Sequence, residues 1–351
     1  MTSTDRYEKE GKNLIFLIGQ PRSGTTLLQR ILGNHAEVHT VSEPWILLYP
    51  LYFLKHEGWD ADFGADLARD AYVEFAKNLK GGNSDYISAV QQMCQYLYNR
   101  VLEGTGKKYF LDKTPRYYLV IREIIHVFPK AKVIILFRNP IAVLCSILNT
   151  WIGKNHELLY HYKKDLLDAP SLLLEAIDEY PSRILKVYYE DLVENPEQEL
   201  RSICGNLNIP FVEGILEYSK ATLPRWKYGD HKTVYKYQRP DPSKANAWTE
   251  SLTDPYVWKL SSEYIDMLGK KVIDKMGYSY NDLIHTLNSN RPEKRKLDFK
   301  VGLRFWLKEP GEKSSFVIRL FTRLNTSLKR RGLKETLRVL GTGALRAISE
   351  Y

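Results

Sequence analysis

Short apolar runs alternate with longer segments of helical periodicity between residues 14 and 276. The runs predicted as strands are residues 14–18, 37–41, 109–111, 133–137 and 184–189. Segments predicted as helices are residues 65–79, 88–102, 116–128, 140–151, 196–207 and 255–276. This alternation predicts an α/β fold with a central, mostly parallel sheet that helices cover on both faces. Ligands of such sheets bind at the carboxyl ends of the strands, so the informative residues should follow the strands directly.

A glycine-containing loop joins the first predicted strand to a helical segment. Gly19 and Gly24 have the spacing of the phosphate-binding sequence G-x-x-x-x-G-K-[ST], but Thr25 stands where the lysine belongs. Because that lysine reaches the outer phosphates of a nucleoside triphosphate, we expect the loop to hold a different anion. Arg22 supplies forked donors suited to phosphate or sulfate. A degenerate nucleotide loop and a plain turn are the alternatives that this octet alone leaves open.

Residues 21–28 resemble the 5′-phosphosulfate loop of the sulfotransferases that use 3′-phosphoadenosine-5′-phosphosulfate (PAPS). The resemblance implies a P-loop NTPase-like three-layer αβα fold, PAPS as co-substrate and 3′,5′-ADP as product. It also implies a set of donor-binding residues: Pro21, Arg22, Ser23, Gly24, Thr25 and Thr26. The similarity extends over about residues 13–280 and favours the carbohydrate and protein-tyrosine branch. The R-K-G-x-x-G-D-W-K signature of the cytosolic aryl branch is absent.

Glu43 follows the second predicted strand. A carboxylate there can take the proton of an acceptor hydroxyl, or it can serve the start of a helix at Pro44. The residues alone do not separate these roles, whereas the resemblance implies a catalytic glutamate at this place. His35 and His39 are rival candidates for the base, although histidines in loops more often have structural roles.

Lys113 ends the third predicted strand, within the sequence Asp112-Lys113-Thr114-Pro115. A solvated lysine is one interpretation. Capping of the helix predicted to begin after Thr114 explains Asp112 or Thr114, but it does not explain a lysine at position 113. The resemblance implies that Lys113 stabilises charge on the leaving phosphate, and it implies a supporting catalytic role for Arg22.

Arg138 ends the fourth predicted strand, and Ser146 follows eight residues later. An arginine and a hydroxyl at this spacing resemble the family's 3′-phosphate motif, and a 3′-phosphate distinguishes PAPS from ATP. Tyr188, at the end of the last strand, is implied to frame the nucleotide site. The polar stretch 228–246 is predicted to be a long loop that acts as a lid. Its match to relatives is loose: Thr233 and Lys244 are the candidate phosphate ligands, and Ala247 precedes Trp248 where relatives carry a basic residue.

The net charge of +9 is concentrated at the C-terminus. Of 51 Lys and Arg, 16 lie in residues 291–351 beside six of the 42 Asp and Glu, which leaves 35 basic and 36 acidic residues before them. We therefore expect a sulfotransferase domain over residues 1–285 and a basic, helical extension over 286–351. The amphipathic tail packs on the core in one interpretation and contacts a membrane or polyanion in another. Nucleic acid is not an expected partner.

Three scattered cysteines, the lack of a signal peptide and the lack of an apolar span predict a cytoplasmic protein with reduced thiols, and peripheral contact with a membrane is the alternative that the basic tail leaves open. No metal is expected. The resemblance thus implies transfer of a sulfuryl group to a hydroxyl, with a carbohydrate acceptor favoured and tyrosine, lipid or a small alcohol as alternatives. A kinase-like enzyme with a degenerate P-loop and a non-catalytic protein that binds membranes or polyanions are the competing hypotheses.

Overall fold

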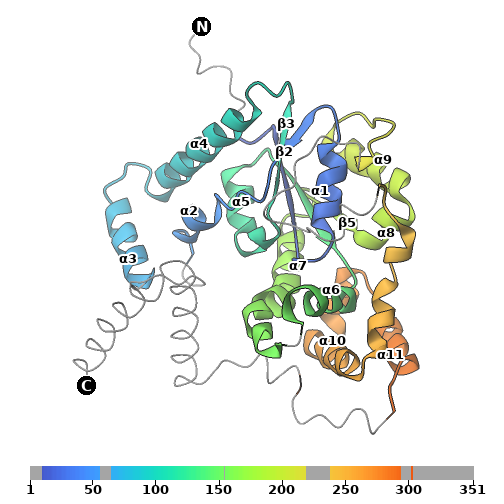
Figure 1. The fold of residues 1–351 in the computed structure, drawn as a ribbon. Coiled ribbons are helices and arrows are strands. Elements are labelled where there is room, and N and C mark those ends of the chain that lie inside the picture. The colour runs from blue at the N-terminus through green and yellow to red at the C-terminus, as the bar shows by residue number, and fades with distance from the viewer. Residues whose placement is uncertain (1–9, 56–64, 154, 219–237, 294–301, 303–351) are drawn as a thin grey trace, which may run out of the picture. The chain divides into compact units, whose positions relative to one another are not determined.

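Five parallel strands form one sheet in the order β2-β3-β1-β4-β5 (Figure 1). The structure is a computed structural model that describes residues 10–55, 65–153, 155–218, 238–293 and 302. The strands are β1 (Leu14–Gly19), β2 (Val38–Thr40), β3 (Tyr109–Lys113), β4 (Lys132–Phe137) and β5 (Ile184–Tyr188). Each coincides with a run predicted from the apolar pattern, which confirms the α/β class.

Eleven α-helices connect and cover the strands within the described residues. They are α1 (Thr25–Gly33), α2 (Leu48–Tyr52), α3 (Ala65–Ala76), α4 (Asn83–Leu102), α5 (Ile121–Val127), α6 (Pro140–Ile147), α7 (Ala169–Glu179), α8 (Tyr189–Glu194), α9 (Pro196–Leu207), α10 (Pro255–Met276) and α11 (Tyr280–Ser289). Short 3₁₀ helices span Pro115–Leu119, His156–Tyr162, Pro242–Lys244 and Ala247–Thr253, and π-helical turns span Leu148–Ile152 and Lys164–Asp168.

The two faces of the sheet carry separate apolar cores. Side chains alternate along a strand, so Phe16 and Ile18 of β1 pack with residues of α4, α5 and α7, whereas Ile15 and Leu17 pack with α1, α8 and α9. Figure 1 shows α4 and α5 on one side of the strands and α1, α8 and α9 on the other. Residues on both faces of β4 are buried, as its unbroken apolar sequence predicts.

Strand β1 occupies the centre of the sheet, between β3 and β4. The chain places β2 and β3 on one side of β1 and then crosses over to place β4 and β5 on the other. Such a switch in strand order leaves a crevice at the carboxyl ends of the central strands. Lys113 of β3 and Ile134 of β4 both lie opposite Leu17, which puts the ends of these three strands near one another.

Two predicted helices are interrupted in the structure. The segment 116–128 begins as the 3₁₀ helix Pro115–Leu119 and continues as α5 only after Val120, whose φ of −136° breaks the helix. The hydroxyls of Tyr117 and Tyr118 bind two different buried carboxylates, those of Asp112 and Asp165. These tertiary contacts override the local helical periodicity. Likewise, α6 ends at Ile147 and continues as a π-helical turn.

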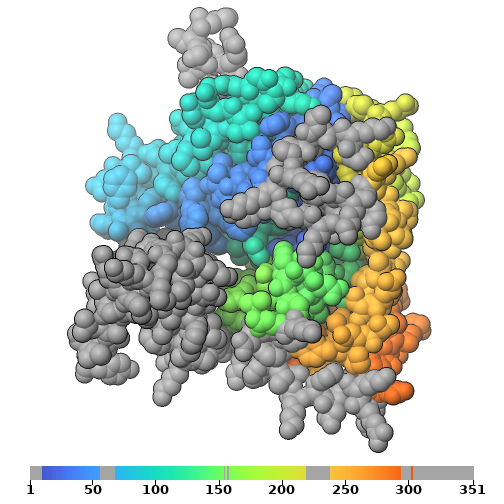
Figure 2. All heavy atoms as spheres, in the orientation of Figure 1, coloured from blue at the N-terminus to red at the C-terminus, as the bar shows by residue number. Residues whose placement is uncertain are grey.

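Helix α10 packs against α6 and α11. In Figure 2 the orange surface of α10 and α11 lies beside the green surface of the segment that follows β4. All described residues belong to one unit, Met1–Leu303. Helix α11 runs across the expected boundary between residues 285 and 286, and apart from its first residues and Gly302 the expected extension lies outside the described residues. The boundary stays a prediction.

The three cysteines are buried and form no disulfide, as predicted. Among the described helices, none combines the length and the apolar character that crossing a membrane requires.

Candidate functional site

The loop between β1 and α1 turns sharply at two left-handed residues. Arg22 has a φ of +73° and Gly24 a φ of +101°. The turn is closed by the N–H of Ser23, which donates to the carbonyl oxygen of Gln20 at 3.1 Å. A Cβ atom at Gly24 would collide with the ring of Tyr189, so only glycine fits here. A tight turn into a helix N-terminus directs backbone N–H groups at a single point, which is the geometry of an anion site.

Two buried polar atoms at this loop have no hydrogen-bond partner within the described part of the chain. They are Oγ of Ser23, whose residue is fully buried, and Nε of Arg138. Buried polar groups in proteins are almost always paired, because leaving them unpaired costs free energy. A guanidinium N–H and a hydroxyl beside the turn are suited to an anion as that partner.

The loop is joined directly to the predicted 3′-phosphate motif. Arg22 donates from Nε to Oγ of Ser146 at 3.0 Å, and Nη1 of Arg138 donates to the carbonyl oxygen of Arg22 at 3.1 Å. The Arg138 guanidinium also lies 4.2 Å from the ring centroid of Tyr189. The two motifs, separated by more than a hundred residues, therefore form one site.

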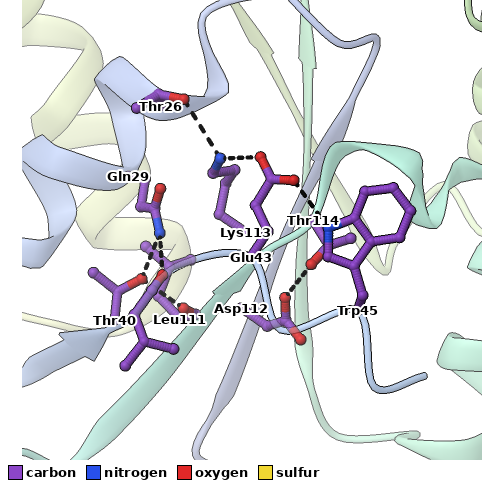
Figure 3. Close-up of polar contacts among 10 residues, drawn as sticks. Thr26, Gln29, Thr40, Glu43, Trp45, Leu111, Asp112, Lys113 and Thr114 are labelled. Atoms are coloured by element: carbon purple, nitrogen blue, oxygen red, sulfur yellow. Dashed lines mark hydrogen bonds and ion pairs between the residues drawn. The ribbon is translucent and has the colours of Figure 1, made fainter. Parts of the chain in front are cut away.

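Lys113 and Glu43 form a buried ion pair beside the loop (Figure 3). The Nζ atom of Lys113 lies 2.5 Å from Oε1 of Glu43 and 3.4 Å from Oγ1 of Thr26. The Lys113 side chain is only 1% exposed, and that of Glu43 is 10% exposed. Burial lowers the pKa of Lys113, while the carboxylate of Glu43 opposes that shift. An ammonium that loses its proton more readily than usual is suited to donate a proton or a hydrogen bond as charge develops nearby.

Asp112 anchors the end of β3 on the face of the sheet opposite to that of its neighbour Lys113. Its carboxylate accepts hydrogen bonds from Tyr98 at 2.6 Å, Thr114 at 2.8 Å and Tyr117 at 3.2 Å. Burial raises its pKa to about 6, against the lowering effect of the three hydroxyls. The hydroxyl of Tyr117 also accepts from the N–H of Leu47 at 3.3 Å. Asp112 thus ties the strand that carries Lys113 to the segment that carries Glu43.

The remaining predicted residues differ in their placement. Tyr188 packs on Phe137 and Tyr278, so the tyrosine in contact with the loop is its neighbour Tyr189. Lys244 lies 3.7 Å from Asp241. Thr233 is outside the described residues. Pro21, Thr25 and Thr26 lie in the loop and the first turn of α1, where all three are buried.

The two rival histidines have structural surroundings. Nδ1 of His35 accepts from the backbone N–H of Glu37 at 3.0 Å, and its Nε2 lies 2.8 Å from the carbonyl oxygen of Pro210. His39 packs on Phe110, and burial lowers its pKa. None of these three contacts involves the glycine loop or the Lys113–Glu43 ion pair.

The predicted site residues do not include three residues that the structure places at the site. Tyr189 supports the loop, Asp112 supports Lys113, and Trp45 donates from Nε1 to Oε2 of Glu43 at 3.1 Å. The one available signal was position, since each lies within two residues of a predicted site residue. Among the described residues, no group of three or more His, Cys, Asp or Glu side chains is placed to hold a metal ion.

Comparison with known proteins supplies independent information. The sequence model described as "Sulfotransferase family" matches residues 14–213, more than half of the 351 residues. Nodulation protein NoeE of Sinorhizobium fredii (strain NBRC 101917 / NGR234) is 27% identical over 289 residues, which cover 76% of this chain and 66% of that protein. Protein-tyrosine sulfotransferase 1 of Danio rerio is 25% identical over 214 residues, 59% of this chain and 56% of that protein.

Among solved structures, the sulfotransferase domain from the curacin biosynthetic pathway is 22% identical, with a TM-score of 0.46 over 78% of this chain and 99% of that one. The chain spans 66% and 56% of the lengths of the two curated relatives named above.

Proposed function

The chain belongs to the sulfotransferase family, as the resemblance of residues 21–28 predicted, and on that premise we propose that it transfers a sulfuryl group from PAPS to an acceptor hydroxyl. The observation that carries the proposal is the contact between the two phosphate motifs. Arg22 of the first motif binds Ser146 of the second, and Arg138 of the second binds the backbone of Arg22. One molecule that bears a 5′-phosphosulfate and a 3′-phosphate would engage both motifs.

The residues present fit such a donor. Nε of Arg138 and Oγ of Ser23 are buried donors beside the turn that have no partner among the described residues, and an anion would supply one. We assign the 5′-phosphosulfate to residues 21–26, including Arg22, and the 3′-phosphate to Arg138 and Ser146. Tyr189 supports both assignments, because its ring contacts Gly24 and the Arg138 guanidinium.

The ion pair provides the acid–base chemistry. Glu43 accepts the proton of the acceptor hydroxyl while the oxygen of that hydroxyl forms the new bond to sulfur. Lys113 donates to the bridging oxygen, which keeps the electron pair of the broken S–O bond and leaves as part of 3′,5′-ADP. Arg22 and the N–H groups of the loop stabilise negative charge on the sulfuryl oxygens. These fixed donors perform the neutralisation that Mg²⁺ performs in kinases.

A carbohydrate is the acceptor that we favour. Two aromatic residues lie at the site: Trp45 binds Glu43, and Trp151 stacks on Tyr162 and lies 5.5 Å from the Arg22 guanidinium. Flat, partly exposed rings of this kind can pack against the apolar faces of sugars. Tyr52, by contrast, is part of the core. The relative named as a protein-tyrosine sulfotransferase makes a tyrosine peptide the second candidate.

Transfer of label from ³⁵S-PAPS tests the proposal. The acceptor panel contains neutral glycosides, a tyrosine peptide and a long-chain alcohol, and the label is followed into each product. The proposal expects transfer to a hydroxyl of at least one class, with glycosides first. If the purified protein binds 3′,5′-ADP but labels none of the three classes, then the acceptor assignment is wrong. If it binds no 3′,5′-ADP, the donor assignment is wrong as well.

The competing hypotheses predict different results. A kinase with a degenerate P-loop would bind ATP in preference to 3′,5′-ADP. Thr25 in the lysine position disfavours this hypothesis. A non-catalytic protein that binds membranes or polyanions would act through the basic tail, and it would show lipid or heparin binding without turnover.

A further inference from the structure

Trp45 has an unfavourable backbone conformation two residues after Glu43. Its φ is +59°, in the left-handed region of backbone conformations that residues other than glycine and asparagine rarely adopt. Backbone strain of this kind persists only where the surrounding contacts outweigh it, and it is concentrated at functional sites. The contacts of the Trp45 indole therefore indicate what the conformation achieves.

The first contact fixes the Glu43 carboxylate. The indole Nε1 of Trp45 donates to Oε2 at 3.1 Å, while Lys113 donates to Oε1 at 2.5 Å (Figure 3). Each carboxylate oxygen thus has one donor, and the two donors come from different segments of the chain. A carboxylate held at both oxygens has one orientation, and each oxygen keeps acceptor capacity for a further hydrogen.

The second contact fixes the indole. The Arg116 guanidinium lies 5.7 Å from the centroid of the Trp45 ring. Asp165, which is buried, accepts three hydrogen bonds from Arg116: from Nε to Oδ1 at 3.0 Å, from Nε to Oδ2 at 3.2 Å and from Nη2 to Oδ2 at 2.6 Å. Asp165 is held in turn by the hydroxyl of Tyr118 at 2.7 Å. A continuous series of contacts therefore runs from a buried carboxylate to the face of the indole.

We propose that Trp45 is a positioning residue for Glu43, whose carboxylate it orients through the indole N–H while the Arg116–Asp165 pair holds the ring in place. This inference rests on the proposed role of Glu43 as the general base. A correctly oriented base accelerates proton transfer without tighter substrate binding. Loss of the N–H should therefore lower kcat and leave the KM for PAPS unchanged. A residue that only packs on the core would affect stability instead.

The test substitutes Trp45→Phe, which keeps an aromatic ring beside Arg116 and removes the donor. We expect kcat to fall about 10-fold, with KM for PAPS and the affinity for 3′,5′-ADP both within about 2-fold of wild type. The matched control is Trp258→Phe. Trp258 also donates from Nε1 to a protein acceptor, the carbonyl oxygen of Leu287, and also lies beside an arginine, Arg291. This control should lower the unfolding temperature and leave kcat unchanged.

A double-mutant cycle with Glu43→Gln separates the two claims. If Trp45 acts through Glu43, Trp45→Phe should change kcat by less than about 2-fold in the Glu43→Gln background. An equal loss in both backgrounds, or a wild-type kcat in the single Trp45→Phe variant, overturns the inference while the role of Glu43 stands. Full turnover by Glu43→Gln overturns both. Should Trp45→Phe fail to fold, Arg116→Lys serves instead: a 3- to 5-fold loss of kcat at constant KM is expected, and unchanged kcat overturns the inference.

Discussion

The Nζ atom of Lys113 lies 2.5 Å from Oε1 of Glu43, and the two residues are 70 positions apart in the sequence. Each comes from the carboxyl end of a strand or from the segment just beyond it, and the sheet brings them together beside the glycine loop. Removing one partner of a buried ion pair leaves the other charge uncompensated. Both residues must therefore be tested with variants that preserve shape or charge.

Glu43→Gln should lower kcat about 100-fold or more, because the amide cannot accept the proton of the acceptor hydroxyl. The proposed donor site consists of the loop and Arg138, so the affinity for 3′,5′-ADP should stay within about 3-fold of wild type. Steady-state kinetics and calorimetry measure the two quantities on the same preparation. Wild-type turnover in this variant would remove Glu43 from the mechanism.

Lys113 should set an alkaline limit to activity. Burial lowers its pKa, so the ammonium loses its proton, and with it the ability to donate, at a lower pH than a free lysine does. As the pH rises through this lowered pKa, kcat should fall. Lys113→Arg stays charged throughout this range, so it should be about 10-fold slower at neutral pH but should lack the alkaline decline. An identical decline in both proteins would assign the titration to another group.

Asp112 should make stability depend on pH in a direction opposite to that of most carboxylates. Burial raises its folded-state pKa to about 6, above the unfolded value, so the folded protein binds the proton more strongly. Its contribution is present below about pH 4 and is lost as the pH rises through about 6. Asp112→Asn can still accept from Tyr98 and Tyr117, and it cannot ionise.

Relative to wild type, the Asp112→Asn variant should therefore gain about 2 kcal/mol of unfolding free energy between pH 4 and pH 7. Denaturant titrations at the two pH values measure this difference. Parallel changes in the two proteins would mean that Asp112 does not titrate as described.

Gly24→Ala tests the close approach of the loop to Tyr189. The new Cβ would require a left-handed alanine and would collide with the tyrosine ring. We expect at least about 10-fold weaker binding of 3′,5′-ADP and about 1–3 kcal/mol of lost stability. Gly82→Ala is the control, because Gly82 also has a positive φ but no atom within 4 Å of the added methyl. Equal losses in the two variants would show that strain alone, and not the Tyr189 contact, causes the effect.

Local pattern was enough to predict the strands and the loop. The apolar run of β4 and the glycine spacing after β1 are both local signals, because each is contained within a few consecutive residues. The contacts among the site residues could not be predicted in this way, because they depend on the direction of each side chain at the end of a strand. At the end of the last strand it is Tyr189 that contacts the loop, because β5 ends at Tyr188 and α8 begins at the next residue, which changes the direction of the side chains. A role of Tyr188 at the nucleotide stays a prediction.

For the same reason, the sequence did not allow the tertiary contacts of the site to be predicted. Nothing in the sequence indicates that Trp45 adopts a positive φ or that Asp112 gathers three hydroxyls. Periodicity also failed at Val120, where a helix is interrupted just after Tyr117 and Tyr118 donate to the carboxylates of Asp112 and Asp165.

The most direct test of the donor assignment is a calorimetric titration of the full chain with 3′,5′-ADP, with 5′-AMP and ATP as comparisons. The account predicts that 3′,5′-ADP binds most tightly, that Arg138→Ala weakens it about 100-fold, and that Arg122→Ala does not. Arg122 pairs with Glu175 and Glu179 on the surface and is the control for loss of an arginine. A preference for ATP, or equal binding by wild type and Arg138→Ala, would contradict the account.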